Sequence, residues 1–371
     1  MEKLQRFLFE SNRLLFFSLI LVLALFKSGI WFMPNIGASI QIAENPFRNP
    51  FADEPLAQYL VWNWLSPFLA YLLGLNGKWS FFSLHLLFSF CLWIVFAIYI
   101  FRKLKEQEAR TALIIFSALP VSATSFFWVG MDSLTLLLML LTILYAGTGI
   151  LRLVFGILLG MQHFEQAFLS FVGLAYFFFG SKGQTTKICN FKSALTVLFG
   201  IVIGKLFLIL IFQTLSVPVL ITGRIIWTQH HFDSLVTNFA LNFQTIFWCS
   251  FGLGWVILLK FCLMMDGILK FLTVLTFYAL FIPFVDDQTR VFSILTFPTI
   301  LSIWLLSPYF LKTWTKQEAS FLFILWILLP WNWAWQGEGH DSVLSYTLAY
   351  LLGRMFGFVD LPPNLPLWPF T

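Results

Sequence analysis

Charged residues are scarce in this sequence. Asp, Glu, Lys and Arg make up 11% of the 371 residues, whereas soluble domains carry about 25%. Hydrophobic residues make up 59%, and the mean hydropathy is +0.86. This composition excludes an ordinary soluble domain and predicts a polytopic membrane protein. The net charge of +5 does not indicate nucleic acid as a partner, because basic residues beside membrane spans produce the same excess.

Cysteine is also scarce. The four cysteines, at positions 91, 189, 249 and 262, show no CxxC spacing, which argues against a disulfide framework and against a zinc site. We expect them to be packing residues. No cleavable signal peptide is expected either, because the first apolar run, 14–33, is long enough to span and no small-residue cleavage pattern ends it.

Long apolar runs are abundant, and a run of about 20 residues predicts a membrane span. Such runs lie at 14–33, 80–101, 111–128, 132–148, 193–215, 238–259, 268–285, 291–311 and 319–335. A further run, 151–179, is interrupted by Gln162 to Gln166 and predicts two short or broken spans. Residues 342–358 fit either a span or an interfacial helix. We therefore predict an all-α polytopic membrane protein, one membrane domain over 1–371 with about 10–12 transmembrane helices.

Lysine and arginine predict the orientation, because they are enriched in cytoplasmic loops. If the amino terminus is inside, 15 of the 22 basic residues lie in inner segments. These are Lys3, Arg6, Arg13, Arg102, Lys103, Lys105, Arg110, Arg152, Lys182, Lys187, Lys192, Lys260, Lys270, Lys312 and Lys316. Outside lie Arg48, Lys78, Arg224 and Arg290, while Lys27 and Lys205 fall in spans and Arg354 is undecided. We expect a multi-pass protein of a bacterial-type plasma membrane with a cytoplasmic amino terminus.

The segment 34–79 is predicted to be a large external loop. Within it, Glu44 to Pro55 contains three carboxylates and three prolines, which predicts irregular backbone with Asp53 and Glu54 at its chemical centre. The apolar and aromatic stretch Leu56 to Gly74 predicts a helix at the membrane surface. As a span, this stretch would place the basic cluster 102–110 outside, so the surface position is preferred.

Two short patches accompany this layout. Leu119 to Ser122 and Phe127 to Leu137 follow the second span and its basic inner loop. With the long acidic first loop and its surface helix, they resemble the GT-C superfamily of integral membrane glycosyltransferases, including the mannosyltransferases of lipid-anchor assembly. The resemblance covers most of the layout and implies transfer of a sugar from a polyprenyl-phosphate donor to an acceptor at the external membrane face.

The resemblance also implies that an acid of the first external loop is the general base, which corresponds here to Asp53 or Glu54. A base must lie within hydrogen-bond reach of the acceptor hydroxyl. The leaving lipid phosphate needs positive charge, from arginine, lysine or a divalent metal. No cofactor is implied with certainty. The simpler interpretation of Asp53 and Glu54 is a loop acid that pairs with Arg48 or stabilises the amino terminus of the next helix.

Other ionisable residues are candidate substrate contacts. His163, Glu165 and Gln166 interrupt an apolar run, where polar groups are costly and indicate function. Arg290, beside Asp287, could hold the lipid phosphate bidentately, although an Asp286–Arg290 pair at helical spacing is equally expected. Lys205 falls within a span and requires a partner or a water-filled cavity, and that partner could be the lipid phosphate or an acid within the membrane. Arg48 is a further candidate substrate contact and, with Arg224, the next candidate for the phosphate after Arg290 and Lys205.

Three further groups have simpler interpretations. Asp132 follows Gly130 at the start of a predicted helix, and this position favours a helix-capping role over a catalytic role. The trio His230, His231 and Asp233 indicates a solvated loop in preference to a metal cluster. The trio Trp331, Trp333 and Trp335 is more typical of an interface belt than of a sugar platform.

Two rival functions remain open: a transporter or flippase of lipid-linked sugars, and a non-catalytic membrane partner of a glycan-assembly complex. A transporter is expected to show broken helices in matching halves. The sequence predicts one break, at 162–166, without a counterpart in the second half.

Overall fold

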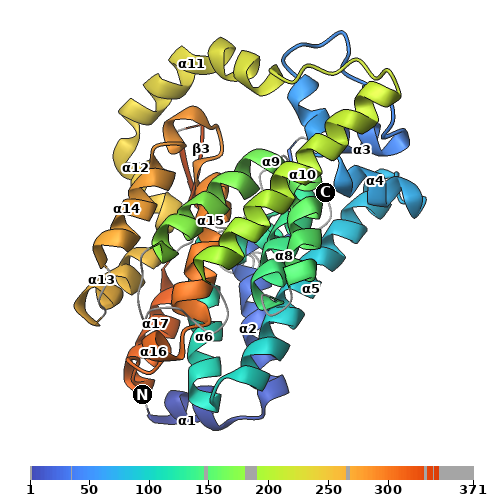
Figure 1. Ribbon diagram of the computed structural model, residues 1–371. Coiled ribbons are helices and arrows are strands. Elements are labelled where there is room, and N and C mark those ends of the chain that lie inside the picture. The colour runs from blue at the N-terminus through green and yellow to red at the C-terminus, as the bar shows by residue number, and fades with distance from the viewer. Residues whose placement is uncertain are drawn as a thin grey trace, which may run out of the picture.

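The computed structural model describes residues 2–34, 36–145, 149–179, 190–264, 268–329, 332–336 and 338–341. These residues form a bundle dominated by helices (Figure 1). The α-helices are α1 Glu2–Glu10, α2 Arg13–Ser28, α3 Ile36–Glu44, α4 Leu65–Leu72, α5 Lys78–Lys103, α6 Glu106–Ala118, α7 Pro120–Phe127, α8 Met131–Leu144, α9 Gly149–Phe178, α10 Phe191–Thr214, α11 Gly223–Leu241, α12 Phe243–Phe251, α13 Gly254–Met264, α14 Ile268–Ala279, α15 Gln288–Ile300, α16 Pro308–Leu311 and α17 Lys316–Leu328.

Short elements complete the fold. The 3-10 helices are η1 Gln58–Trp62 and η2 Ile282–Phe284, and a π-helical turn, η3 Leu301–Leu305, continues α15. Strand β1 Trp31–Phe32 pairs in parallel with β2 Trp128–Val129, and β3 Asn332–Trp335 pairs antiparallel with β4 Glu338–Asp341. The described part of the chain is therefore all-α apart from these two small ladders.

Several helices are long and apolar enough to cross a membrane. Among the described residues, α5 and α10 meet this condition alone, and three bent pairs would raise the number of candidate spans to five. The pairs are α1 with α2, bent by 110°, α6 with α7, bent by 62°, and α12 with α13, bent by 72°. The described residues thus support membrane crossing, while the predicted 10–12 spans stay a prediction.

Local breaks explain why apolar runs became shorter helices. Pro120 begins α7 and has no N–H to continue the helix before it. Gly252 ends α12 with a positive φ of 49°, a conformation that favours glycine. The run 238–259 accordingly divides among α11, α12 and α13, and the run 319–335 ends its helix at Leu328 and continues into β3. Residues 342–358 lie outside the described residues.

The external loop differs from its prediction. The segment around Glu44 to Pro55 is irregular, as expected, but α3 precedes it. The predicted surface helix over 56–74 was wrong as a single helix: it divides into η1 and α4, separated by Asn63 and Trp64. The indole N–H of Trp64 donates to the Pro46 carbonyl at 2.7 Å, so buried polar contacts fix this division.

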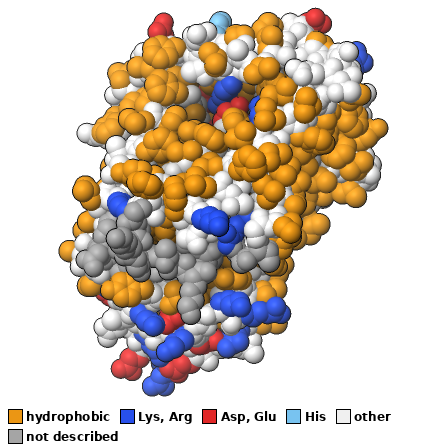
Figure 2. All heavy atoms as spheres, viewed as in Figure 1, with side chains coloured by type: hydrophobic (Ala, Val, Ile, Leu, Met, Phe, Trp, Pro, Cys, Tyr) orange, Lys and Arg blue, Asp and Glu red, His pale blue; other side chains and the backbone are white. Residues whose placement is uncertain are grey.

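The two ends of the molecule differ in charge. Lys and Arg side chains, with fewer Asp and Glu side chains among them, gather at the end where α1 and α6 lie, while apolar side chains cover most of the flank (Figure 2). At that end, Arg110 is buried against α1 and donates to the Leu8 carbonyl at 2.7 Å. Helix α15, whose residues are nearly all buried, is packed by α7, α8, α9 and α12 and carries the candidate site at its amino terminus.

Candidate functional site

A cavity of about 250 Å³ lies where α8, α9, α11 and α15 meet the segment 34–79, which was predicted to be an external loop. Figure 2 shows acidic and basic side chains in a hollow of the otherwise apolar surface. The polar lining residues are Tyr59, Asn63, Asp132, His163, Glu165, Gln166, Arg224, Thr228 and Arg290. These polar residues come from segments up to 231 positions apart in the sequence, from Tyr59 to Arg290.

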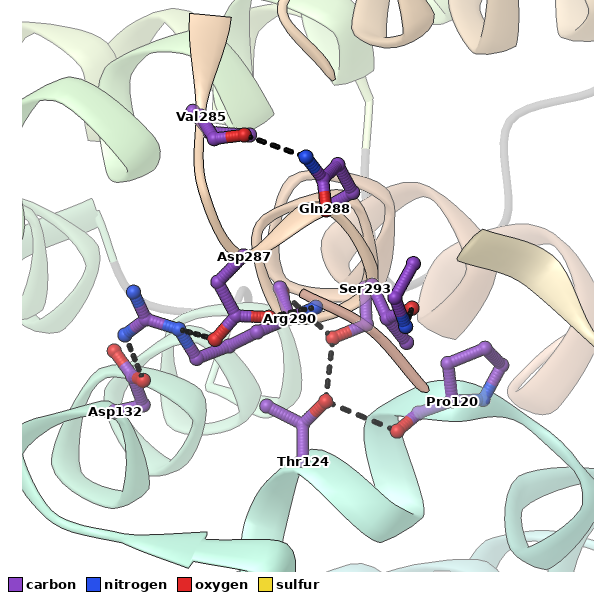
Figure 3. Close-up of polar contacts among 10 residues, drawn as sticks. Pro120, Thr124, Asp132, Val285, Asp287, Gln288, Arg290 and Ser293 are labelled. Atoms are coloured by element: carbon purple, nitrogen blue, oxygen red, sulfur yellow. Dashed lines mark hydrogen bonds and ion pairs between the residues drawn. The ribbon is translucent and has the colours of Figure 1, made fainter. Parts of the chain in front are cut away.

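Arg290 is held by two carboxylates (Figure 3). Its Nε donates to Asp287 at 2.6 Å, and a terminal nitrogen donates to Asp132 at 2.6 Å. All three side chains are buried, with 17%, 6% and 1% exposed for Arg290, Asp287 and Asp132. Two of the five N–H donors of this guanidinium therefore hold carboxylates, and removing either partner would leave an uncompensated buried charge.

The local sequence explains the contact between Asp287 and Arg290. Asp287 is the N-cap of α15, and its carboxylate accepts from the backbone N–H of Arg290 at 3.2 Å. The predicted Asp286–Arg290 pair was wrong: the partner is Asp287, at a spacing of three. The predicted capping role of Asp132 was also wrong, because Gly130 is the N-cap of α8 and Asp132 pairs with Arg290.

The Asp287 carboxyl lies before α15 and titrates abnormally. Burial raises the pKa of Asp287 from its ordinary value of 3.8 to about 7, although the neighbouring Arg290 opposes the shift, and the second carboxylate, Asp132, adds to the rise. A single guanidinium shared by two buried carboxylates explains this direction, because it cannot fully compensate both charges.

Hydroxyl groups fix α15 below the arginine. Ser293 Oγ donates to the Arg290 carbonyl at 2.8 Å and lies 2.7 Å from Thr124 Oγ1 of α7 (Figure 3). Thr289 Oγ1 accepts from the Ala334 N–H at 2.9 Å, and the Gln336 N–H donates to the Asp286 carbonyl at 2.6 Å. The arginine therefore projects from a helix end that is attached both to α7 and to the β3 hairpin.

The predicted break in the run 151–179 is confirmed as a kink in α9 at His163, whose φ of −158° and ψ of 78° are not helical. Gln162 stabilises the kink: its amide oxygen accepts from Ser66 N at 2.9 Å and its amide nitrogen donates to the Met131 carbonyl at 2.8 Å. The kink brings His163 and Glu165 together at the cavity, with Nδ1 and the carboxylate 3.9 Å apart. Glu165 is 44% exposed, so solvent and substrate can reach it.

Arg224, from α11, is the second arginine of the cavity. Its guanidinium lies 4.7 Å from the ring centres of both Tyr59 and Trp227. Within the described part of the chain it forms no ion pair with a carboxylate. The sequence made Arg224 only a reserve candidate for the lipid phosphate, with Arg48 and after Arg290 and Lys205, because only four basic residues were assigned to the outside.

The loop acids and Arg48 lie elsewhere. Asp53, Glu54 and Arg48 are exposed, and none of them lines the cavity. Their predicted roles stay predictions. Lys205 does not line the cavity either; its ammonium lies 3.7 Å from the ring centre of Trp62 and 5.5 Å from that of Phe164. The partners of this lysine are thus two aromatic rings, together with the Glu165 carboxylate, with which it interacts electrostatically.

Two remaining predictions needed correction. His230, His231 and Asp233 lie on helix α11, not in a loop. Across the described ranges, no three His, Cys, Asp or Glu side chains are placed to hold a metal ion. Trp333 is 1% exposed and packs against Phe127 at 4.6 Å between ring centres, so this member of the predicted interface belt is a core residue. Trp335 packs against Trp128 at 5.3 Å between ring centres, and Trp331 lies outside the described residues.

Chemically, the cavity combines an accessible carboxylate, a histidine and an arginine that forms no salt bridge with a carboxylate within the described residues. This set suits proton abstraction from a hydroxyl group and stabilisation of an anion. Comparison with known proteins does not assign this chain to a family, because no family model, curated protein or solved structure matches it.

Proposed function

We propose that this protein is a membrane glycosyltransferase that moves a sugar from a polyprenyl-phosphate donor to an acceptor hydroxyl, with the cavity as the reaction site. The observation that supports this most is that one cavity is lined both by the Glu165 carboxylate, whose nearest ion-pair partner is the His163 ring at 3.9 Å, and by Arg224, which forms no salt bridge in the described part of the chain. The cavity would face the exterior, with the basic end and the amino terminus in the cytoplasm of a bacterial-type cell.

Glu165 is proposed as the general base. The acceptor oxygen forms a bond to the anomeric carbon, the bond from that carbon to the phosphate oxygen breaks, and the electron pair leaves with the lipid phosphate. The acceptor proton passes to the Glu165 carboxylate. Glu165 replaces Asp53 and Glu54 in this role because it lines the cavity and they do not.

Arg224 is proposed to bind the leaving phosphate. A guanidinium stacked on Tyr59 and Trp227 keeps its N–H groups free for bidentate contact with phosphate oxygens. Arg290, the earlier candidate, is engaged by Asp132 and Asp287 and is assigned instead to holding Asp132 in place. Lys205 would add positive charge near the path of the lipid, beside Trp62.

The proposal is tested with purified protein in lipid nanodiscs and liposomes, supplied with a polyprenyl-phosphate hexose. Wild type should transfer the sugar to an acceptor, and Arg224→Ala should raise the donor KM and lower kcat/KM about 10²-fold, a loss typical of one charged contact in the transition state. Arg48→Ala, an exposed arginine outside the cavity, is the matched control and should behave as wild type. Movement of the lipid-linked sugar across liposomes without transfer would instead identify a flippase.

A further inference from the structure

Three buried polar atoms at the cavity have no hydrogen-bond partner. They are Oδ1 of Asp132, Oε1 of Gln166 and Nδ1 of His163. Asp132 and Gln166 are only 1% and 7% exposed. Buried polar atoms are normally paired, because an unpaired one loses its hydration without replacement. Three such atoms around one cavity therefore indicate a ligand that completes them.

The unpaired atoms specify hydrogen-bond donors on that ligand. The carboxylate oxygen of Asp132 and the amide oxygen of Gln166 are both acceptors. The charged side chains in and next to the lining balance one another: Asp132, Asp287 and Glu165 are opposed by Arg290, Arg224 and Lys205. A balanced lining gives no preference for an ammonium group or another cation, so a neutral ligand rich in hydroxyl groups fits best.

The size of the cavity limits the ligand further. Its volume of about 250 Å³ is below the range of about 300–1,000 Å³ that holds drug-sized molecules. Apolar side chains such as Leu169, Val291 and Leu295 form part of the wall and can contact the C–H face of a ring. One sugar ring fits these conditions, whereas an oligosaccharide does not.

We infer that the cavity binds a single hexose with free hydroxyl groups, which donate to Asp132 and Gln166, as the sugar of the donor. This assignment rests on the proposed function and makes Gln166 a specificity-determining residue. It disfavours an N-acetylhexosamine, because the acetamido group is bulkier than a hydroxyl and brings a carbonyl oxygen toward sites that already present acceptors.

The test measures binding without requiring transfer. Farnesyl-phosphate glucose and mannose, their singly deoxygenated analogues and farnesyl-phosphate N-acetylglucosamine are titrated against the purified protein by isothermal calorimetry. At least one deoxy analogue of a bound hexose should bind wild type about 10-fold more weakly, which is the effect of one lost hydrogen bond. Gln166→Met should bind that hexose and that analogue equally, while Gln166→Glu, which keeps an acceptor, should retain the discrimination.

Gln213→Met, the same change at an exposed position at the end of α10, is the matched control and should discriminate as wild type does. Tight binding of the N-acetylhexosamine donor, or equal binding of all deoxy analogues by wild type, would overturn the assignment even if sugar transfer occurs. Selective hexose binding without any transfer would leave the hexose site standing and remove the proposed enzymatic function.

Discussion

Single residues show where the sequence was informative and where it was not. His163, Glu165 and Gln166 stood out because polar groups inside an apolar run are costly, and all three line the cavity. Asp132 was interpreted from its neighbours alone, as a cap, because its partner Arg290 is 158 positions away. Local composition also favoured Asp53, whose carboxylate is exposed outside the cavity, since acidity in a sequence does not report distance in space.

The buried Asp287 predicts a pH dependence of stability. The pKa of Asp287 is raised from 3.8 to about 7. Between these two pH values, the carboxyl is therefore protonated in the folded protein and deprotonated in the unfolded chain. This group therefore stabilises the fold below about pH 4, and its contribution is lost as the pH rises toward 7. Thermal unfolding from pH 4 to pH 8 should show a larger loss of stability in wild type than in Asp287→Asn. Identical pH profiles for the two proteins would contradict this assignment.

The lengths of the apolar runs predicted the helices only in part. Apolar run length located α5 and α10 within a few residues of their predicted ends, because nothing interrupts those runs. It did not predict the bends between α6 and α7 or between α12 and α13, of 62° and 72°, because hydrophobicity is the same on both sides of a bend. The breaks follow the proline and glycine that begin or end these helices.

The pair α9 and α10 depends on glycine. Gly156 and Gly160 of α9 face Gly200 and Gly204 of α10, and a Cβ at any of them would collide with the backbone of the other helix. Small residues at this spacing allow close approach of membrane helices. Gly160→Leu should separate the two helices and destabilise the protein by about 1–3 kcal/mol or more, with a lower thermal midpoint and weaker donor binding, because the kink at His163 lies on α9.

The control for this prediction is Gly149→Ala, at the start of α9, where an added Cβ meets no atom within 4 Å. It should leave the thermal midpoint unchanged or slightly raised, since alanine is the better helix former. An equal loss of stability in both variants would show that the close approach of α9 and α10 is not the cause.

The whole molecule has a basic end and a cavity end, and this polarity predicts its orientation in the membrane. Ala52 lies in the loop that is predicted to be external, and Gln107 lies at the basic end on α6; both are exposed. In a background without native cysteines, Ala52→Cys and Gln107→Cys should be labelled by an impermeant thiol reagent from opposite sides of the membrane. Phe51, next to Ala52, is not a suitable position for the labelled cysteine because only 6% of this residue is exposed. Labelling of both from one side would place the loop and the basic end in the same compartment.

The central claim is that the cavity, and not the acidic loop, carries the base. Its most direct test is the steady-state rate of sugar transfer by Glu165→Gln and Asp53→Asn in nanodiscs. Glu165→Gln preserves shape and removes only the proton acceptor, so kcat should fall by about 10²–10⁴ with little change in donor KM, while Asp53→Asn retains wild-type turnover. Full activity of Glu165→Gln together with an inactive Asp53→Asn would contradict the account and return the base to the external loop.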